Sequence, residues 1–408
     1  MEKAKPLKLL YIICMTIVFI SSSDDSLNIL SDKFRYLVIL VWVLIAVVQF
    51  LLNHIVENRK VFIAEKNRKE KNFFLAELLK LNNIVRIVIY VYTVILVCSG
   101  LTEERFLSTN MQTFINGVSA IAGVYLFGDK TFKYGMISLI AAYLTSLYIG
   151  ISLGKPIRSL FELHDIAFAT GFIILYFICA KDLCKSGGLK YLGSSVLIFF
   201  LAFKRIGIGA MVIALIAWVI LKKNTLFKNT NMIRIAGVVA FFLCELYVYF
   251  ILSGKLGDFL AIYNLNMMGR DYYYAVFAQM ADFMPSFIGW GRNAVSVILT
   301  QDYPWLKVGN VHSDLLRMYL ECGFVLYAVW LWNYLILLPK RLGEIFGEKM
   351  ELFTFICTCY IFIVYMTDNV ELYMTTQYFY VLVISQYYFY LKRRGEIIYK
   401  MPKRKKIA

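Results

Sequence analysis

Residues 36–54 read YLVILVWVLIAVVQFLLNH, nineteen residues without Asp, Glu, Lys or Arg. An α-helix needs about 20 mostly apolar residues to cross the hydrocarbon layer of a bilayer. This stretch therefore predicts a transmembrane helix, and the whole chain shares its character. Of the 408 residues, 60% are hydrophobic and 17% are charged, and the mean hydropathy is +0.66. A water-soluble protein could not bury so much apolar surface, so composition excludes a soluble enzyme, a disordered chain and a secreted disulfide scaffold.

Eleven further apolar segments predict twelve spans in all. In chain order the predicted spans are 8–21, 36–54, 84–101, 111–127, 131–152, 166–180, 191–203, 208–221, 233–252, 314–338, 352–367 and 373–391. We expect the first to be a retained helix, because the polar turn SSSDD at 21–25 follows it in place of a small-residue cleavage site. The fold class expected is an all-α polytopic integral membrane protein, with residues 1–408 forming a single membrane domain.

The positive charges test this topology. The chain carries 43 Lys and Arg against 27 Asp and Glu, a net charge of +16. If the N-terminus is cytoplasmic, twelve spans place 30 of the Lys and Arg in cytoplasmic segments and 12 in outer segments. Cytoplasmic loops of membrane proteins are enriched in Lys and Arg, so this split favours an even number of spans and two cytoplasmic termini. No nucleic-acid partner is expected, and the basic tail 392–408 is expected to lie against anionic lipid.

Two loops and the cysteines complete the organisation. Segment 55–83 is polar and is expected to be a cytoplasmic loop carrying a surface helix. Segment 253–313 is a long extracytoplasmic loop, rich in Tyr, Trp and Gly, and we expect it to pack on the outer mouth of the bundle, because long ordered loops are usually functional. The eight cysteines fall mostly within spans and form no CxxC pair, which indicates apolar filler. We find no internal repeat.

Several catalytic motifs are absent. The sequence has no DxD for a metal-bound nucleotide sugar, no Walker sequence for ATP and no GxSxG elbow for a serine nucleophile. GWGRNA at 289–294 fits a loose GxGxxA, but it follows no strand–helix pattern and is discounted as a dinucleotide site. We therefore expect no cofactor and no metal.

The candidate functional residues are cations on the outer side of the predicted topology. A positive charge placed there at the membrane boundary costs free energy unless an anion or a buried partner compensates it. Arginine suits phosphate, because its planar fork donates two parallel hydrogen bonds and never loses its charge. The candidates are Lys204, Arg205, Arg270, Arg292 and Arg317.

The arginines also have structural interpretations. Arg205, in the tight turn FKRI at 203–206, could extend to lipid headgroups. Arg270 could pair with Asp271 next to it, and Arg292 could be a surface charge of the loop.

The start of the tenth predicted span carries further candidates. His312 precedes this span, and an imidazole with an ordinary pKa of about 6.5 can act as a base at neutral pH. Arg317 could bind an anion, or could pair with Asp314 three residues before it or Glu321 four residues after it on the same helix. Glu321 and Glu245 fall within predicted spans, where a carboxylate is either functional or the structural partner of an arginine.

These residues resemble a known family. HSDLLRMYLECG at 312–323, which opens a span after a long outer loop, resembles the Wzy-type polysaccharide polymerases of the O-antigen ligase superfamily. FIGWG at 287–291 is similar to the glycine pair that precedes this histidine in the family. FKR at 203–205 and GR at 269–270 fit its two other arginine positions, and twelve spans with a long late loop fit its organisation. Ser313 departs from the family, which often has Asn there.

The resemblance implies a GT-C-like membrane glycosyltransferase without a metal or cofactor. Such an enzyme polymerises undecaprenyl-diphosphate-linked oligosaccharide repeat units into capsular, exo- or O-antigen polysaccharide at the outer face of the bacterial cytoplasmic membrane. Its arginines bind the diphosphate and stabilise the charge that grows on it, and its histidine takes a proton from the acceptor hydroxyl. Membrane lipid, a chain-length regulator and a flippase are the further partners implied. The residues implied are His312, Arg270 and Arg205 as catalytic, and Arg317, Arg292, Lys204 and Glu321 as substrate-binding.

The sequence leaves other functions open. A ligase of the same superfamily would transfer finished chains to lipid A core; a composition rich in Lys and Ile favours an AT-rich, Gram-positive genome and hence a polymerase. A lipid-linked oligosaccharide flippase would also have about twelve spans, but predicts two related halves around a cation-lined cavity. A scaffold without enzymatic activity is the third class.

Overall fold

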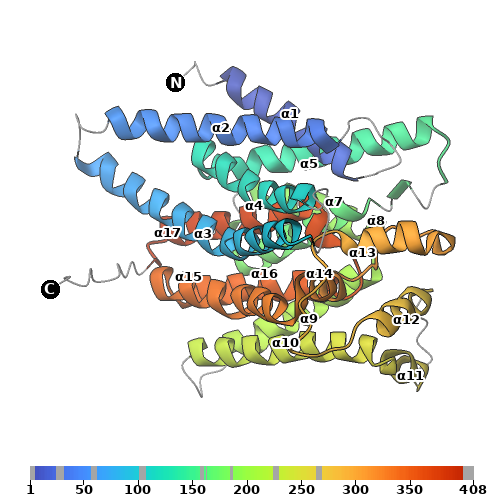
Figure 1. Ribbon diagram of the computed structural model, residues 1–408. Helices are drawn as coiled ribbons and strands as arrows, with labels where there is room; N and C mark the ends of the chain where they lie inside the picture. The colour runs from blue at the N-terminus through green and yellow to red at the C-terminus, as the bar shows by residue number, and fades with distance from the viewer. Residues whose placement is uncertain are drawn as a thin grey trace.

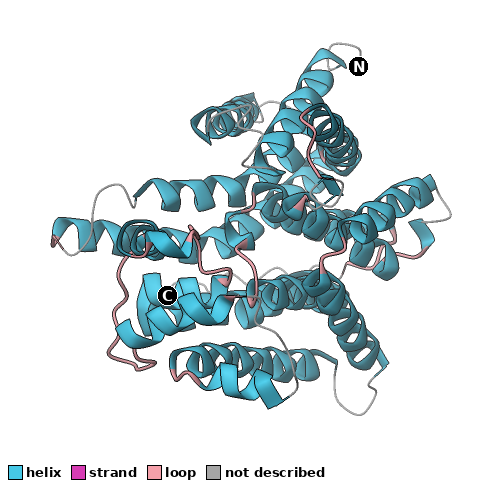
Figure 2. Ribbon diagram, turned by 90° about the vertical axis from the view of Figure 1, so that its right-hand side faces the viewer, coloured by secondary structure: helices cyan, strands magenta, loops and turns pink. Residues whose placement is uncertain are grey.

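The computed structural model describes residues 5–23, 32–56, 62–100, 107–156, 160–161, 163–183, 187–223, 229–262 and 269–397. Within these ranges all regular elements are helical and no β-strand occurs. The long helices lie side by side, most of them along roughly one direction, as Figures 1 and 2 show. The predicted all-α class is confirmed.

The helices of the first part of the chain correspond to the first nine predicted spans. They are α1 (Lys5–Ser23), α2 (Asp32–Val56), α3 (Phe62–Cys98), α4 (Leu107–Phe127), α5 (Lys130–Ser152), α7 (His164–Cys179), α8 (Leu189–Ala202), α9 (Arg205–Lys223) and α10 (Asn229–Leu252).

The later part alternates short and long elements. They are α11 (Lys255–Ile262), α12 (Arg270–Met280), α13 (Ala294–Val297), η6 (Ile298–Asp302), η7 (Pro304–Leu306), α14 (Asp314–Trp332), η8 (Asn333–Leu337), α15 (Leu338–Phe346), α16 (Glu348–Tyr365), η9 (Val370–Leu372) and α17 (Met374–Arg393). Each of the last three predicted spans also falls on helix.

Six helical stretches of the described chain are long and apolar enough to cross a membrane. They are Arg35–Leu52, Glu70–Cys98, Lys130–Ser152, Arg205–Lys222, Thr230–Leu252 and Asp314–Phe346. The apolar stretches Pro6–Ser22, Gln112–Phe127, Asp165–Cys179 and Leu189–Ala202 are shorter. The outer face of α2 agrees with a lipid environment, because Leu37, Leu44 and Leu51 recur every seventh residue and are each more than half exposed. Their length and apolar composition are compatible with a multi-pass membrane protein.

The interior of the bundle is formed by α16 and α17. Nearly all residues of α17 are buried, and most of those of α16. Aromatic rings fill the space around them; the Phe74 ring, for example, stacks on that of Tyr388 with centroids 4.0 Å apart. These two helices are therefore surrounded by protein rather than by lipid.

The segment predicted as a separate cytoplasmic loop differs in the structure. Of residues 55–83, those from Phe62 onward belong to α3, which continues without interruption into the third predicted span. Residues 57–61 lie outside the described chain. The continuity has a simple cause: the 37 residues of α3 contain neither Gly nor Pro, so nothing ends the helix at the expected boundary.

The long loop 253–313 is largely helical. Its described part contains α11, α12, α13, η6 and η7, while residues 263–268 lie outside the described chain. Figure 1 shows α11, α12 and α13 together at the right-hand end of the bundle. These elements therefore lie at one end of the bundle; that this end is the outer mouth stays a prediction.

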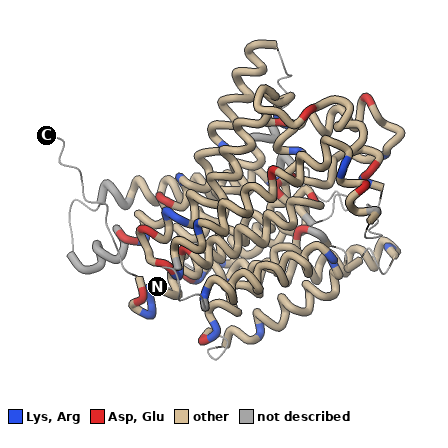
Figure 3. The backbone as a smooth tube through the Cα atoms, turned by 90° about the horizontal axis from the view of Figure 1, so that it is seen from below, with Lys and Arg blue, Asp and Glu red and all other residues tan. Residues whose placement is uncertain are grey.

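Ion pairs tie the far end of α17 to the rest of the bundle. This helix starts beside η9 and its 20 residues carry it about 30 Å away from the long loop. Figure 3 shows charged residues gathered mainly toward the two ends of the helices. The pairs are Lys392 with Glu70, Arg393 with Asp129 and Arg394 with Asp182.

The first part of the basic tail therefore contacts protein carboxylates from three other segments. The sequence predicts that the tail 392–408 lies against lipid; residues 398–408 of it lie outside the described chain. A helix end that carries three cations is stabilised by nearby anions whatever their source, and here the bundle itself supplies them.

Candidate functional site

The site is built on a break in α14. Gly323 has φ 75° and ψ 171°, which no continuous helix contains, so the hydrogen-bond ladder stops there. The segment before α13 replaces the missing bonds: the N–H groups of Trp290 and Gly291 donate to the carbonyls of Leu320 and Glu321, both at 2.9 Å. Irregular backbone of this kind is tolerated inside a membrane protein when it is buried in protein.

The glycine pair of FIGWG is required by this contact. A Cβ atom on Gly289 would lie 2.4 Å from the backbone nitrogen of Gly323, and φ of Gly289 is +80°. The N–H of Phe324 closes the contact by donating to the carbonyl of Phe287 at 2.9 Å. The glycines therefore let the long loop 253–313 lie backbone to backbone against the broken helix α14.

Arg292 follows directly and points into the protein. Its Nη1 atom lies 2.7 Å from Oε2 of Glu321, and its Nη2 atom lies 2.9 Å from Oε2 of Glu371. The side chain is 2% exposed. The interpretation of Arg292 as a surface charge is therefore wrong.

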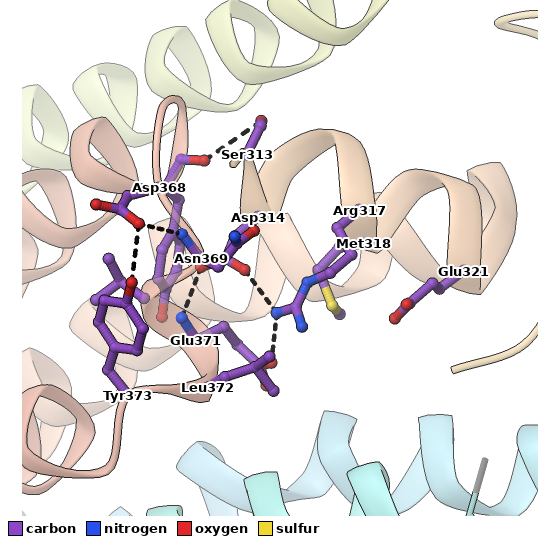
Figure 4. A network of polar contacts seen from close by, with 12 residues as sticks. Ser313, Asp314, Arg317, Met318, Glu321, Asp368, Asn369, Glu371, Leu372 and Tyr373 are labelled. Atoms are coloured by element: carbon purple, nitrogen blue, oxygen red, sulfur yellow. Dashed lines mark hydrogen bonds and ion pairs between the residues drawn. The ribbon is translucent and has the colours of Figure 1, made fainter. Parts of the chain in front are cut away.

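Arg317 meets the same carboxylate from α14. Its Nη2 atom donates to Oδ1 of Asp314 at 2.5 Å and to Oε2 of Glu371 at 2.9 Å. The N–H of Glu371 in turn donates to Oδ2 of Asp314 at 2.6 Å. Figure 4 shows these contacts between the start of α14 and the segment that leads into α17. The pairing of Arg317 with Asp314 is confirmed, and so is the interpretation of Glu321 as the partner of an arginine.

Glu371 is the carboxylate that the two arginines share. Burial alone would raise the pKa of its carboxyl, but the guanidinium groups of Arg292, Arg317 and Arg86 outweigh burial and hold the pKa below its ordinary value. Glu371 is therefore an anion in the folded protein at neutral pH.

Arg86 approaches Glu371 from α3. Its Nη2 atom donates to Oε1 of Gln377 on α17 at 3.0 Å. Arg86, Glu371 and Gln377 border a small internal space that also includes Tyr365 and Tyr334. The space has room for about one water molecule, so it is not a substrate pocket.

His312 lies next to this cluster, two residues before α14. The accessible surface that carries His312 and Arg270 is called the rim below. It is exposed, has φ +48°, and comes directly before Ser313, whose hydroxyl caps α14 by accepting the N–H of Leu316 at 3.3 Å. The Ser313 hydroxyl also donates to the carbonyl of Tyr365 at 3.4 Å. The His312 ring lies 6.3 Å from that of Tyr273, centroid to centroid.

Arg270 starts α12, the helix that carries Tyr273. Its Nη2 atom donates to the carbonyl of Thr367 at 3.0 Å, and the side chain is half-buried. Burial raises the pKa of Tyr273 to about 12 although Arg270 lowers it, so the phenol is neutral beside the arginine. The hydroxyl of Tyr247 donates to the carbonyl of Met366, the residue before Thr367, at 2.5 Å. Arg270 and His312 thus flank one rim, and the segment after α16 supports both.

Arg205 and Lys204 lie at the turn between α8 and α9. Phe203 takes a left-handed φ of +43° there, and Arg205 is the first residue of α9 and is exposed. A Cβ on Gly207 would contact the ring of Phe168, which stacks 6.5 Å from that of Tyr373. The turn therefore lies at the same end of the bundle as His312 and Arg270.

The predicted site residues fall into two groups. Arg292, Arg317 and Glu321 form the buried cluster, whereas His312, Arg270, Lys204 and Arg205 are at least partly accessible. Direct contact of these three residues with a substrate stays a prediction; in this structure Arg292 pairs with Glu321, and Arg292 and Arg317 both bind Glu371. Chemically, the rim offers an accessible imidazole base, a guanidinium group and a neutral phenol.

Sequence reasoning missed Glu371 and Arg86. Both have partners that lie far away along the chain, which no local pattern reveals. A signal for Glu371 was nevertheless present: the short segment DNVEL at 368–372, between the last two predicted spans, holds two carboxylates and no cation.

Among the described side chains, no group of three or more His, Cys, Asp or Glu is placed to hold a metal ion. Comparisons of this chain with protein families, with curated proteins and with solved structures give no match.

Proposed function

We propose that this protein is a membrane glycosyltransferase that polymerises undecaprenyl-diphosphate-linked oligosaccharide repeat units at the outer face of the bacterial cytoplasmic membrane. One observation carries the proposal: the accessible His312 and Arg270 lie at one rim, on elements that a buried ion-pair cluster joins. A base beside a fixed cation is what glycosyl transfer from a lipid diphosphate requires.

The proposed topology has twelve spans in a GT-C-like arrangement with both termini in the cytoplasm. Its support is that all twelve predicted segments fall on helices and that the Lys and Arg residues divide 30 to 12 between the two sides. The ion pairs of Lys392, Arg393 and Arg394 would then lie on the cytoplasmic side, and His312 on the outer side.

The proposed reaction is a single displacement. His312 takes the proton from an acceptor sugar hydroxyl, whose oxygen forms a bond to the anomeric carbon of the donor. The bond from that carbon to the diphosphate oxygen breaks, and the diphosphate leaves with the electron pair. Arg270, Arg205 and Lys204 bind the diphosphate and stabilise its growing negative charge. Attack from the opposite face inverts the anomeric configuration.

Arg292, Arg317 and Glu321 contribute to this proposal by supporting the rim. Each is 1 to 2% exposed and ion-paired, so in this conformation the two arginines carry no free charge for a phosphate. They fix the start of α14, and therefore the position of His312.

The test is chain growth by the purified protein supplied with lipid-diphosphate repeat units. We expect wild-type protein to produce a ladder of polymer lengths, and His312→Ala and Arg270→Ala each to abolish it while the protein still inserts. Lys255→Ala is the matched control, because Lys255 is another exposed cation of the outer loop, and it should leave the ladder unchanged. A normal ladder from either rim variant would overturn the proposal. Transfer of a preformed chain to lipid A core without growth would instead identify a ligase.

A further inference from the structure

We propose that Glu371 is a positioning residue that fixes the positions of His312 and Arg270 relative to one another. This inference rests on the proposed function. Glu371 lies too deep to touch a substrate, with its side chain 4% exposed. It acts through the segment 366–373, which links α16 to α17 and contacts the supports of both rim residues.

The first step is the junction with α14. Glu371 accepts from Arg317 at 2.9 Å and donates its N–H to Asp314 at 2.6 Å, so side chain and backbone both bind the first turn of the helix. The N–H of Asp314 also donates to the carbonyl of Asp368 at 3.2 Å. His312 lies two residues before Asp314, so the position of this turn determines the position of His312.

The second step is the junction with the outer loop. Glu371 accepts from Arg292 at 2.9 Å, and Arg292 continues the segment that fills the break at Gly323. The same Oε2 atom therefore joins α14 and the loop before α13. Two charge-assisted bonds to one oxygen form a strong and directional joint.

The third step leads to Arg270. Its guanidinium group donates to the carbonyl of Thr367, four residues before Glu371 in the same segment. If the segment moves, this carbonyl moves with it, and the direction in which Arg270 points changes. Glu371 thus controls the separation of the rim base and the rim cation without contacting either.

Charge explains why a neutral residue cannot replace it. Three guanidinium groups, those of Arg86, Arg292 and Arg317, lower the pKa of Glu371 against the effect of burial. In Glu371→Gln the amide oxygen can still accept one hydrogen bond, but the amide N–H₂ is a donor that faces arginine donors. Two buried cations then lose their shared anion, and the segment is expected to move away.

The experiment compares Glu371→Gln with Glu351→Gln. Glu351 is also a buried glutamate paired with an arginine, Arg234, but it lies near the start of α16, at the other end of the bundle from Thr367.

The first measurement does not need enzyme activity. Asn369→Cys is introduced after Cys98 and Cys184 are changed to Ser, and the rate at which a hydrophilic maleimide labels the new thiol is measured. Asn369 is 5% exposed, so the thiol that replaces its amide should be protected. We expect Glu371→Gln to raise the labelling rate about tenfold or more, and Glu351→Gln to leave it unchanged.

The second measurement is a double-mutant cycle on chain growth. Misplacement of a rim group by about 1 Å can lower the rate about 100-fold, so Glu371→Gln should mainly lower kcat, with a smaller effect on KM. In an Arg270→Lys background the same substitution should cost less than about tenfold, because the two residues act in series. Additive effects in the cycle would indicate a purely structural role and overturn the inference.

The two proposals fail in different ways. If the wild-type protein forms no polymer but Glu371→Gln still exposes the thiol introduced by Asn369→Cys, the function is wrong and the positioning by Glu371 stands. If polymer forms and Glu371→Gln changes neither labelling nor kcat, or if Glu351→Gln does the same as Glu371→Gln, the inference is wrong. If Glu371→Gln does not fold, Glu371→Asp is used in its place. Glu371→Asp keeps the charge, and the thiol of Asn369→Cys should then be labelled at an intermediate rate. A labelling rate equal to that with Glu371 intact would contradict the inference.

Discussion

Gly289 and Gly323 lie backbone to backbone, so closely that a Cβ on Gly323 would come within 2.3 Å of the carbonyl carbon of Ile288. The contact joins the long loop 253–313 to the broken helix α14, and the direction in which Arg292 enters the protein depends on it. Both glycines have positive φ, a region that other residues rarely adopt.

Gly289→Ala should therefore destabilise the protein. The added methyl group has to displace backbone, and we expect a loss of about 2 to 3 kcal/mol in the free energy of unfolding. Gly309→Ala is the control: Gly309 lies in the same long loop, and its Cβ would meet only Thr300 Cγ2 at 4.0 Å. Thermal unfolding in detergent, followed by tryptophan fluorescence, measures both. Equal melting temperatures for the two variants would contradict the contact.

The charge balance of the buried cluster predicts a rescue. Arg292→Met leaves Glu321 buried and without its cation, and we expect a loss of about 3 to 5 kcal/mol. The double variant Arg292→Met with Glu321→Met removes one charge of each sign and should recover part of that loss. Lys349→Met, which breaks an exposed pair with Glu396, should cost less than about 1 kcal/mol. A double variant less stable than Arg292→Met alone would show that the pair is not held by charge.

Glu371 predicts how stability varies with pH. Its pKa in the folded chain lies below the ordinary value of 4.5, because the arginines outweigh burial. A group with a lowered pKa stabilises the folded state above its unfolded pKa, and that contribution is lost as the pH falls through the folded pKa. Asp314 is a second carboxyl next to Glu371 and is present in both proteins. The contribution of Glu371 is therefore measured as the difference between wild type and Glu371→Gln. Their difference in melting temperature should be constant from about pH 7 to about pH 5 and should shrink below about pH 4.5. A difference that grows on acidification would reverse the sign and refute this.

The proposed topology predicts the order in which two thiols react. Cys98 is exposed at the end of α3, on the proposed outer side, so a membrane-impermeant maleimide should label it in intact cells. A cysteine replacing Lys349, whose side chain is 63% exposed in the first turn of α16, should react only after permeabilisation. The labelling of the Lys349→Cys variant is measured with Cys98 and Cys184 changed to Ser. If both sites react in intact cells, the span count between them is wrong.

The helices could be predicted from sequence because apolar periodicity is local. Each predicted span is helical, and the turn at Phe203 and Lys204 falls within a residue or two of its expected place. The boundary of α3 was missed because polarity changes along this segment while helix propensity does not.

The site could be predicted only in part, for a related reason. The pair of Arg317 and Asp314 is three residues apart on one helix and was foreseeable. The bond between Arg292 and Glu371 joins residues 79 positions apart, and only the folded bundle brings them together. The sequence predicts that a cation at the membrane boundary needs an anion or a buried partner; in this structure Arg292 is paired with two glutamates of the protein.

The break in α14 has a consequence for protein engineering. Because Trp290 and Gly291 complete the hydrogen bonds of Leu320 and Glu321, the long loop and the part of α14 before Gly323 form a single structural unit. A chimaera that exchanges the loop with that of another protein should therefore place its second junction after Phe324 rather than at the predicted membrane boundary, since a junction at Asp314 would separate each donor from its acceptor.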